Sequence, residues 1–208
     1  MKILMINGSP HEKGCTYTAL KEIESVLNEE GVQSEILHIG GEAMHTCIGC
    51  NACKKAGRCL RYPDDVVNRT IEKVREADGF IFGSPVHYAS ACGAITTYLD
   101  RIFYCAGSAF RFKPGAAIVS CRRGGATAAF DQLNKYFTIS QMPIVSSQYW
   151  NMVHGNTPAE VRQDLEGLQG MRTLARNMVY LIRCIEVGKA AGVPFPKQEQ
   201  KISTNFIR

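Results

Sequence analysis

Four cysteines lie within the thirteen residues CIGCNACKKAGRC, at positions Cys47, Cys50, Cys53 and Cys59. The spacing is C-x2-C-x2-C-x5-C, and gaps of two residues allow successive thiolates to converge on one iron–sulfur cluster. Four thiolates also bind zinc, although zinc ligands usually come as two separated pairs. Free or redox-active thiols are the third alternative, because spacing alone rarely identifies a metal. The sequence leaves these three alternatives open.

The cysteine-rich stretch, about residues 45–63, interrupts the regular pattern of the chain as an insertion. Three basic residues could offset the charge of bound thiolates or simply face solvent: Lys54, Lys55 and Arg58. Asp64 and Asp65 follow Pro63 and are predicted to cap the next helix.

The other five cysteines are expected to have different roles. Cys92, Cys105 and Cys184 fall in helical patterns and Cys121 falls at a strand end, so we expect buried, small hydrophobic side chains. Cys15 precedes a helix, where the helix dipole can depress a thiol pKa. The alternative for Cys15 is a residue of a phosphate-binding loop.

Length and composition indicate an ordinary globular protein. The 208 residues are 45% hydrophobic and 21% charged, which suits a single domain over residues 1–208. The net charge of +5 is spread between acidic residues, so no nucleic-acid partner is expected. The first apolar run ends at Asn7, too soon for a signal peptide, and no run reaches the length of a membrane span. We expect a cytoplasmic protein with reduced cysteines and no membrane partner.

Five short apolar runs predict the strands that must position these residues: 2–6, 33–39, 79–83, 115–120 and 143–147. All but the second lack clean alternation, which is typical of strands covered on both faces. Segments with apolar residues at three- and four-residue steps separate the runs and predict helices. The alternation of strand and helix predicts an α/β fold with a parallel sheet between two helical layers.

A long helix over about residues 158–189 is predicted to close the sheet. Thr157 is a plausible N-cap, with Pro158 at the first helical position and Glu160 at the third. The tail from Gly192 onward is expected to run over the surface.

The loop NGSPHEKGCTYT follows the first strand and leads into a helix. Its backbone N–H groups and the positive end of the helix dipole suit a phosphate, and Ser9, Thr16, Thr18 and His11 can add side-chain donors. There is no G-x-G-x-x-G and no Walker lysine, so a monophosphate fits better than a pyrophosphate. A plain turn is the alternative.

Two later loops end strands at the same edge of the predicted sheet, where open α/β sheets bind their ligands. In GSPVHYASACGA, Pro85 stiffens the loop, while Val86 and Tyr88 offer surface to a ring system. In SCRRGGATAA, Gly124 and Gly125 allow the backbone to approach a flat ligand. Three such loops together predict a pocket.

The segments GSPHEKGCT, GSPVHYASACGAITTYLDR and SCRRGGATAAFDQLNKYF resemble the three flavin loops of the NADPH-dependent FMN reductase family, over about residues 1–150. The resemblance implies a flavodoxin-like three-layer sandwich, a five-stranded parallel sheet in the order 2-1-3-4-5, and FMN as cofactor. It implies phosphate contacts from Ser9, His11, Cys15, Thr16 and Thr18. It implies ring and ribityl contacts from Pro85, Val86, His87 and Tyr88, and contacts with the polar edge of the ring from Arg122, Gly124 and Gly125.

Two residues depart from the family pattern. His11 stands where the family usually has Arg or Lys, and Cys15 stands where it usually has Asn. We therefore expect phosphate binding to depend more on backbone N–H groups. The cysteine stretch resembles the compact motif of iron–sulfur flavoproteins, which implies a [4Fe-4S] cluster beside FMN; cysteine-rich stretches also occur in family members not known for a cluster.

The resulting expectation is an FMN-dependent NAD(P)H oxidoreductase that reduces a quinone, flavin, nitro or azo compound by ping-pong hydride transfer. His87 and Tyr88 could donate protons to the acceptor or only shape the pocket. One alternative is an iron–sulfur electron carrier that accepts electrons from ferredoxin, and another is a non-catalytic flavin-binding module. The aromatic segment 146–155 is expected to lie at a homodimer or homotetramer contact and at the pocket rim.

Overall fold

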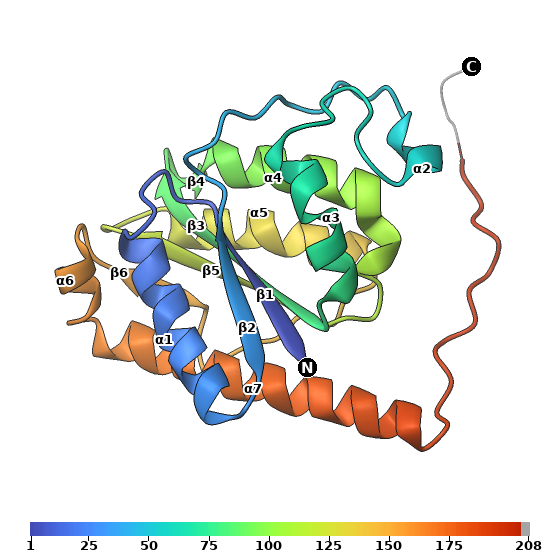
Figure 1. The fold of residues 1–208 in the computed structure, drawn as a ribbon. Coiled ribbons are helices and arrows are strands. Elements are labelled where there is room, and N and C mark those ends of the chain that lie inside the picture. Colours follow the sequence, from blue (N-terminus) through green and yellow to red (C-terminus); the bar gives the residue numbers. More distant parts are fainter. Residues whose placement is uncertain (205–208) are drawn as a thin grey trace.

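The sheet of this protein lies between two layers of helices in the computed structural model, which describes residues 1–204 (Figure 1). The strands are β1 (Lys2–Asn7), β2 (Gln33–His38), β3 (Gly79–His87), β4 (Ser90–Ala91), β5 (Gly115–Cys121) and β6 (Met152–His154). Five of them are parallel in the order β2-β1-β3-β5-β6, and the short β4 pairs antiparallel with β3. The predicted flavodoxin-like α/β class is confirmed, whereas β4 was not predicted.

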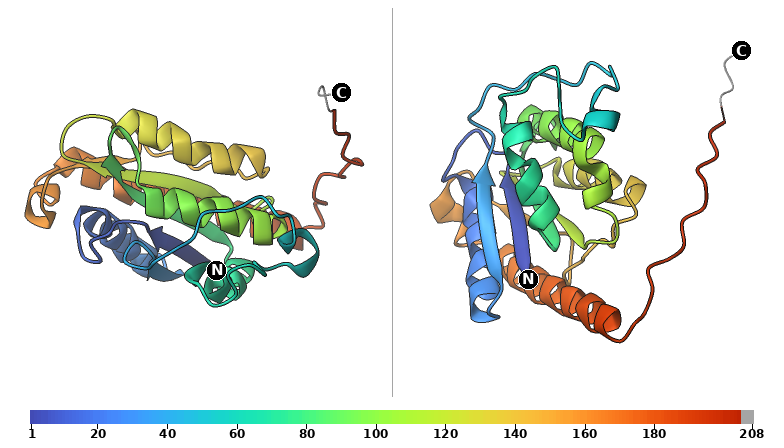
Figure 2. Two further views of the ribbon diagram at one scale, coloured as in Figure 1. Left: turned by 90° about the horizontal axis from the view of Figure 1, so that it is seen from above. Right: turned by 45° about the vertical axis from the view of Figure 1, so that its right-hand side comes forward.

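The helices cover both faces of the sheet (Figure 2). One layer holds α1 (Cys15–Glu29) and α7 (Leu165–Ala190), and the other holds α3 (Val66–Glu76), α4 (Gly93–Ala106) and α5 (Ala126–Ile139). The short elements are α2 (Cys53–Ala56), the 3-10 turn η1 (Gly107–Ala109) and α6 (Pro158–Val161). The right-handed crossover expected of parallel strands requires such intervening helices.

Strand β1 shows why its sequence is a continuous apolar run. Ile3 and Met5 pack against the α1–α7 layer, and Leu4 and Ile6 pack against the opposite layer. All four side chains are at most 1% exposed. Burying one such side chain contributes about 1.5–3 kcal/mol, so both faces of the strand stabilise the sheet.

The fifth parallel strand lies later than predicted. Residues 143–147 form a single bridge, in which the Gly115 N–H donates to Pro143 O at 2.9 Å and the Val145 N–H donates to Gly115 O at 2.9 Å. The regular ladder with β5 begins at Met152. Just before this ladder, the Asn151 side chain donates to Ala117 O at 3.1 Å and its backbone carbonyl accepts the Val119 N–H at 3.0 Å.

The C-terminal helix is two helices rather than one. Thr157 caps α6 as predicted, because its Oγ1 accepts a hydrogen bond from the Glu160 N–H at 3.2 Å. The chain then turns, and Asp164 Oδ1 accepts from the Gly167 N–H at 2.9 Å and starts α7. The prediction of a continuous helix is therefore wrong at this turn.

Two further expectations concern the surface. Cys184 is exposed on α7, against the prediction of burial, whereas Cys92, Cys105 and Cys121 are buried as predicted. The described part of the tail is exposed, with Phe195 stacked on Phe112 at 5.2 Å between ring centroids, and residues 205–208 lie outside the described part. Within residues 1–204, no helix combines the length and apolar character needed to cross a membrane.

Candidate functional site

The first loop connects β1 to α1 and is fixed from below by a buried asparagine. The fully buried Asn7 accepts the Ser9 N–H on Oδ1 at 3.1 Å and donates through Nδ2 to Glu12 O at 2.9 Å. From β2, His38 Nε2 donates to Ser9 O at 2.7 Å. No sequence motif singles out Asn7 or His38, because both side chains bind the backbone of a loop that only the fold brings close to them.

The start of α1 is open to an anion. Gly14 occupies the N-cap and supplies no side-chain acceptor, and the first turn contains no acidic residue. The N–H groups of a first turn have no partner inside the helix, and the helix dipole adds positive charge there. His11 is exposed at this end, as a phosphate-binding role requires.

The hydroxyl groups of the first loop are largely occupied within the protein. Thr16 Oγ1 lies 2.8 Å from Ser120 Oγ in the interior, and Thr18 Oγ1 donates to Gly14 O at 3.1 Å. Ser9 Oγ accepts a backbone N–H, which leaves its own hydrogen free to donate. Phosphate contacts from Thr16 and Thr18 stay predictions, and their backbone N–H groups are the better placed donors.

Cys15 has the environment of an unreactive thiol. Its Sγ lies 3.6 Å from Gly155 O, to which it donates. Burial raises the pKa of Cys15 above its ordinary value, and the charge of Glu160 adds to this effect. The thiol is therefore protonated near neutral pH, which favours the loop role over the reactive one.

The second loop is a tight hairpin at the end of β3. Residues 86–91 form it, and the two residues at its tip, Tyr88 and Ala89, have φ values of 49° and 57°. A two-residue turn with both φ values positive is the type I′ hairpin, which usually carries Asn or Gly because other side chains are strained there. His87 and Tyr88 are exposed at the tip, and Pro85 is half-buried behind them.

The third loop, between β5 and α5, packs directly on this hairpin. Gly125 has a φ of 90°, and a Cβ atom there would lie 2.6 Å from the Cα of Ala89. Gln132 on α5 accepts the Ser90 hydroxyl at 2.6 Å and the Ala91 N–H at 2.9 Å. The second and third loops are thus held together as one rim.

The first and second loops are also joined, through a buried cysteine. The Cys92 N–H donates to Ser84 Oγ at 3.0 Å, and Cys92 Sγ donates to Gly8 O at 2.9 Å. The Gly8 N–H donates to Gly83 O at 2.9 Å. The structure therefore brings all three predicted loops to one edge of the sheet.

The resulting rim suits a ligand with a phosphate and a flat ring. A second helix N-terminus opens on it, because α5 begins at Gly125 with no side-chain cap and no acidic residue in its first turn. Arg122, Gly124, His87 and Tyr88 are exposed along it. These residues fit FMN: donors for the phosphate, a glycine-lined approach and an aromatic side chain for the ring.

The four cysteines of the insertion line one pocket, together with Arg101, Tyr104 and Cys105 of α4. Cys47 and Cys50 are exposed, and Cys53 and Cys59 are half-buried. Within residues 1–204, however, no three His, Cys, Asp or Glu side chains converge in a metal-binding arrangement. The four thiols are suitable ligands for a thiolate-bound metal in their chemistry, their number and their shared pocket. Their sulfur atoms do not converge on one point in this structure.

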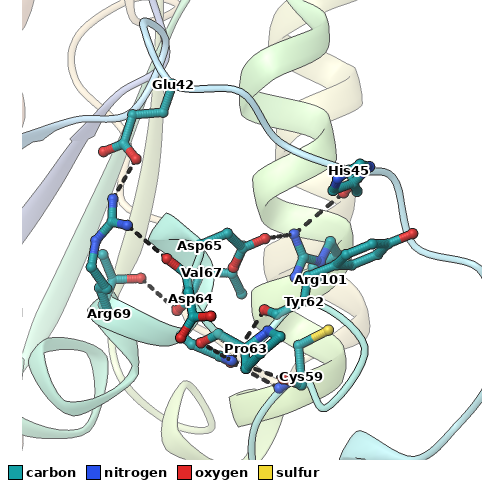
Figure 3. A network of polar contacts seen from close by, with 12 residues as sticks. Glu42, His45, Cys59, Tyr62, Pro63, Asp64, Asp65, Val67, Arg69 and Arg101 are labelled. Atoms are coloured by element: carbon teal, nitrogen blue, oxygen red, sulfur yellow. Dashed lines mark hydrogen bonds and ion pairs between the residues drawn. The ribbon is translucent and has the colours of Figure 1, made fainter.

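A buried arginine lines this cysteine pocket, and Figure 3 shows the polar contacts around it. Arg101 on α4 is 2% exposed, pairs through Nη1 with Asp65 Oδ2, and donates to His45 O at 3.3 Å. Its Cζ lies 5.0 Å from the centroid of the Tyr62 ring. Asp65 occupies the N-cap of α3 as predicted, but its side chain accepts no bond from that helix and binds Arg101 instead.

The pocket shifts two thiols in opposite directions. Burial raises the pKa of Cys59, but the nearby Arg101 guanidinium and backbone groups outweigh this effect, and the pKa lies below its ordinary value. Burial and the neighbouring Cys53 raise the pKa of Cys105 to about 12. Cys105 is a fifth cysteine of the same wall that the sequence spacing did not reveal.

Comparison with known proteins identifies relatives of this chain. An iron-sulfur flavoprotein of Methanocaldococcus jannaschii is 30% identical over 194 residues, which cover 89% of this chain and 100% of that protein. An iron-sulfur flavoprotein of Archaeoglobus fulgidus is 29% identical over 183 residues, covering 86% of this chain and 88% of that protein. The structure of a flavodoxin from the domain Archaea has a TM-score of 0.60 at 12% identity, covering 88% of this chain and 99% of that one, and shares the fold.

The model of the NADPH-dependent FMN reductase family matches residues 1–157, which include all three rim loops and the cysteine stretch. This match supports FMN as the cofactor, and the iron-sulfur flavoprotein relatives fit a [4Fe-4S] cluster. The chain belongs to the NADPH-dependent FMN reductase family, and its chemistry is that of a flavin oxidoreductase.

Proposed function

We propose that this protein binds FMN at the three-loop rim and uses it to transfer electrons from NAD(P)H to a small acceptor, such as a quinone, a free flavin, or a nitro or azo compound. The observation that carries the proposal is the joining of three loops and two uncapped helix N-termini at one sheet edge. Bound FMN would supply the hydride chemistry, which no side chain can supply.

The roles of the chain's own residues follow from the rim. The N–H groups at the start of α1, with Ser9 and His11, would hold the phosphate, since Gly14 leaves them uncapped. The hairpin would lay Pro85, Val86 and Tyr88 against the ring. Arg122, Gly124 and Gly125 would approach its polar edge.

Proton supply to the acceptor is a separate part of this proposal. His87 is exposed at the hairpin, where its ring can reach a molecule bound over the flavin. Changing His87 to Gln should slow the reduction of acceptors that take up protons by a larger factor than it weakens FMN binding.

The test is direct. Purified protein should be yellow, or should take up FMN with quenching of flavin fluorescence, and should then oxidise NADPH or NADH with parallel-line ping-pong kinetics. Failure of the protein to bind FMN would refute the proposal at its base. Binding without NAD(P)H oxidation would leave the non-catalytic flavin-binding module instead.

A second function, electron carriage through an iron–sulfur cluster, is favoured by one specific observation. Four cysteines share a pocket wall with a buried arginine: Cys47, Cys50, Cys53 and Cys59. These thiolates would hold a [4Fe-4S] cluster, and ferredoxin would be the electron donor. Anaerobic purification followed by iron, sulfide and zinc analysis separates the alternatives. About four iron and four sulfide per chain would support the cluster, whereas protein that contains neither iron nor zinc would support free thiols.

Assembly and location complete the proposal. The exposed Tyr149 and Trp150 lie in segment 146–155, which we assign to a contact between copies in a homodimer or homotetramer. Aromatic residues are enriched at such contacts. A cytoplasmic location suits the nine cysteines, because thiols stay reduced there. Light scattering of the FMN-bound protein tests the assembly.

A further inference from the structure

Arg101 is a buried cation on the apolar face of α4. It continues the spacing from Tyr98 to Cys105, both of which are buried. A guanidinium in such a position costs several kcal/mol unless it is paired and hydrogen-bonded. Its presence at 2% exposure therefore requires a partner for each of its donor groups.

The structure supplies partners to one end of the guanidinium and leaves the other end free. Nη1 binds Asp65 Oδ2 and His45 O. Nη2 is buried with no hydrogen-bond partner among the described residues, and Asp65 Oδ1 is also unpaired. A bidentate pair, the usual arrangement of arginine with carboxylate, would satisfy both atoms. Asp65 and Arg101 are joined by a single contact, between Oδ2 and Nη1, so Nη2 does not bind Asp65.

The free end belongs to the cysteine pocket. Arg101 lines that pocket together with all four cysteines of the motif, and Asp65 does not line it. The pair therefore presents its positive end to the thiols and its negative end to α3. Tyr62 lies against the guanidinium and limits its movement. Figure 3 shows this arrangement, with Asp65, His45 and Tyr62 around Arg101 and Cys59 nearby.

The other cations near the cysteines are less suited to this position. Arg61 also lines the pocket but is exposed, as are Lys54, Lys55 and Arg58. Charges in solvent are screened within about 10 Å at ordinary salt, whereas a buried charge is screened much less. Of these cations, Arg101 would therefore have the strongest electrostatic effect on a charge in the pocket.

This inference rests on the proposed cluster at Cys47, Cys50, Cys53 and Cys59. We propose that Arg101 is a positioning residue of the metal pocket: Asp65 fixes its guanidinium so that Nη2 faces the cysteines and donates to the sulfur atoms of a thiolate-bound cluster. Donors to ligand sulfur and nearby positive charge stabilise the more reduced, more negative form of a cluster. Arg101 therefore raises the reduction potential of the cluster.

The decisive variant is Arg101→Lys, which keeps the charge and the pair with Asp65 but lacks the second donor nitrogen. Arg69→Lys is the matched control, because Arg69 is an exposed arginine on α3 that pairs with Glu42. A second variant, Asp65→Asn/Arg101→Gln, removes both charges together, so that no buried carboxylate is left unpaired. Circular dichroism establishes folding of each protein.

Each protein is loaded anaerobically with iron and sulfide, iron per chain is counted, and the reduced cluster is titrated by electron paramagnetic resonance. At the wild-type midpoint we expect the ratio of reduced to oxidised cluster to fall about tenfold in Arg101→Lys, which is about 59 mV for a one-electron couple. The double variant should shift in the same direction, and Arg69→Lys should match wild type.

The outcomes separate the inference from the proposed function. A cluster that loads in Arg101→Lys with an unchanged potential overturns the role of Arg101 and leaves the cluster standing. A shift of equal size in Arg69→Lys overturns it as well, because the effect would then be one of general charge. Wild-type protein that takes up no iron refutes the cluster itself, and the inference with it.

Discussion

The contact between the third loop and the hairpin gives the sharpest prediction. Gly125 has a φ of 90°, and a Cβ atom there would lie 2.6 Å from Ala89 Cα, 3.0 Å from Ala89 Cβ and 3.0 Å from Val86 Cγ1. A non-glycine residue in the left-handed region costs about 1–2 kcal/mol. Overpacking against fixed neighbours costs about 1–3 kcal/mol more. Gly125→Ala should therefore lower the free energy of unfolding by about 2–5 kcal/mol.

Relief of this clash should also impair the proposed cofactor site. The nearest atom is backbone, so the hairpin tip must move away from α5, and the ring-binding surface moves with it. We expect the FMN dissociation constant to rise at least tenfold, about 1.4 kcal/mol, in a fluorescence titration. Urea unfolding without FMN measures the stability change separately.

The matched control is Gly107→Ala. Gly107 lies in η1 with a φ of −53°, and no heavy atom lies within 4 Å of an added Cβ. Both its stability and its FMN affinity should stay near those of wild type. If Gly125→Ala binds FMN within twofold of wild type and is equally stable, the reasoning that ties the second loop to the third is wrong.

Three further predictions concern single side chains. Asn7→Ala removes both hydrogen bonds that hold the first loop. Unpaired buried groups cost about 1–3 kcal/mol each, so urea unfolding should show a loss of about 2–6 kcal/mol, together with weaker FMN binding. Wild-type stability and FMN affinity in this variant would contradict the reasoning. Thr16→Val should lower the free energy of unfolding by about 1–2 kcal/mol, because the hydrogen bond with Ser120 is lost. Its FMN affinity should stay within threefold of wild type. A tenfold loss of affinity would mean that the Thr16 hydroxyl binds the phosphate. In metal-free protein, Cys105 should resist alkylation below about pH 11, because its pKa is raised to about 12 and the reactive thiolate forms only as the pH approaches that value. Mass spectrometry that finds Cys105 modified before the exposed Cys184 would contradict this.

The sequence predicted most of the fold because the decisive signals were local. The buried runs of β1, β3 and β5 and the apolar periodicity of α1, α3 and α4 are each visible in a short window. The fifth strand was misplaced because β6 has only three residues, Met152–His154, while 143–147 is longer and contains two adjacent β-branched residues. The break before α7 depends on one capping side chain, Asp164, in a segment that otherwise continues the helical pattern.

The sequence predicted the three loops of the candidate site, but it did not predict the side-chain contacts that hold them in place. The three loops follow strands and carry recognisable residues, so their meeting at one edge follows from parallel topology. The clamp of Asp65 on Arg101 joins residues 36 positions apart in two helices, and the sequence indicated a different role, capping, for Asp65. The signal that could have found it was a charged residue on the apolar stripe of α4, since Arg101 falls in register with Tyr98 and Cys105.

The attachment of the β3–β4 hairpin to α5 limits how this protein can admit its substrates. Gln132 accepts two hydrogen bonds from the hairpin, and Gly125 packs closely against Ala89 at the hairpin tip. If the hairpin opened as a flap, α5 would have to move with it, and the packing of Phe137 and Leu133 in the core opposes that movement. On the proposed function, the electron donor and the acceptor would therefore bind in turn at a site that stays open, and the choice between them would depend on the contacts that each can make there.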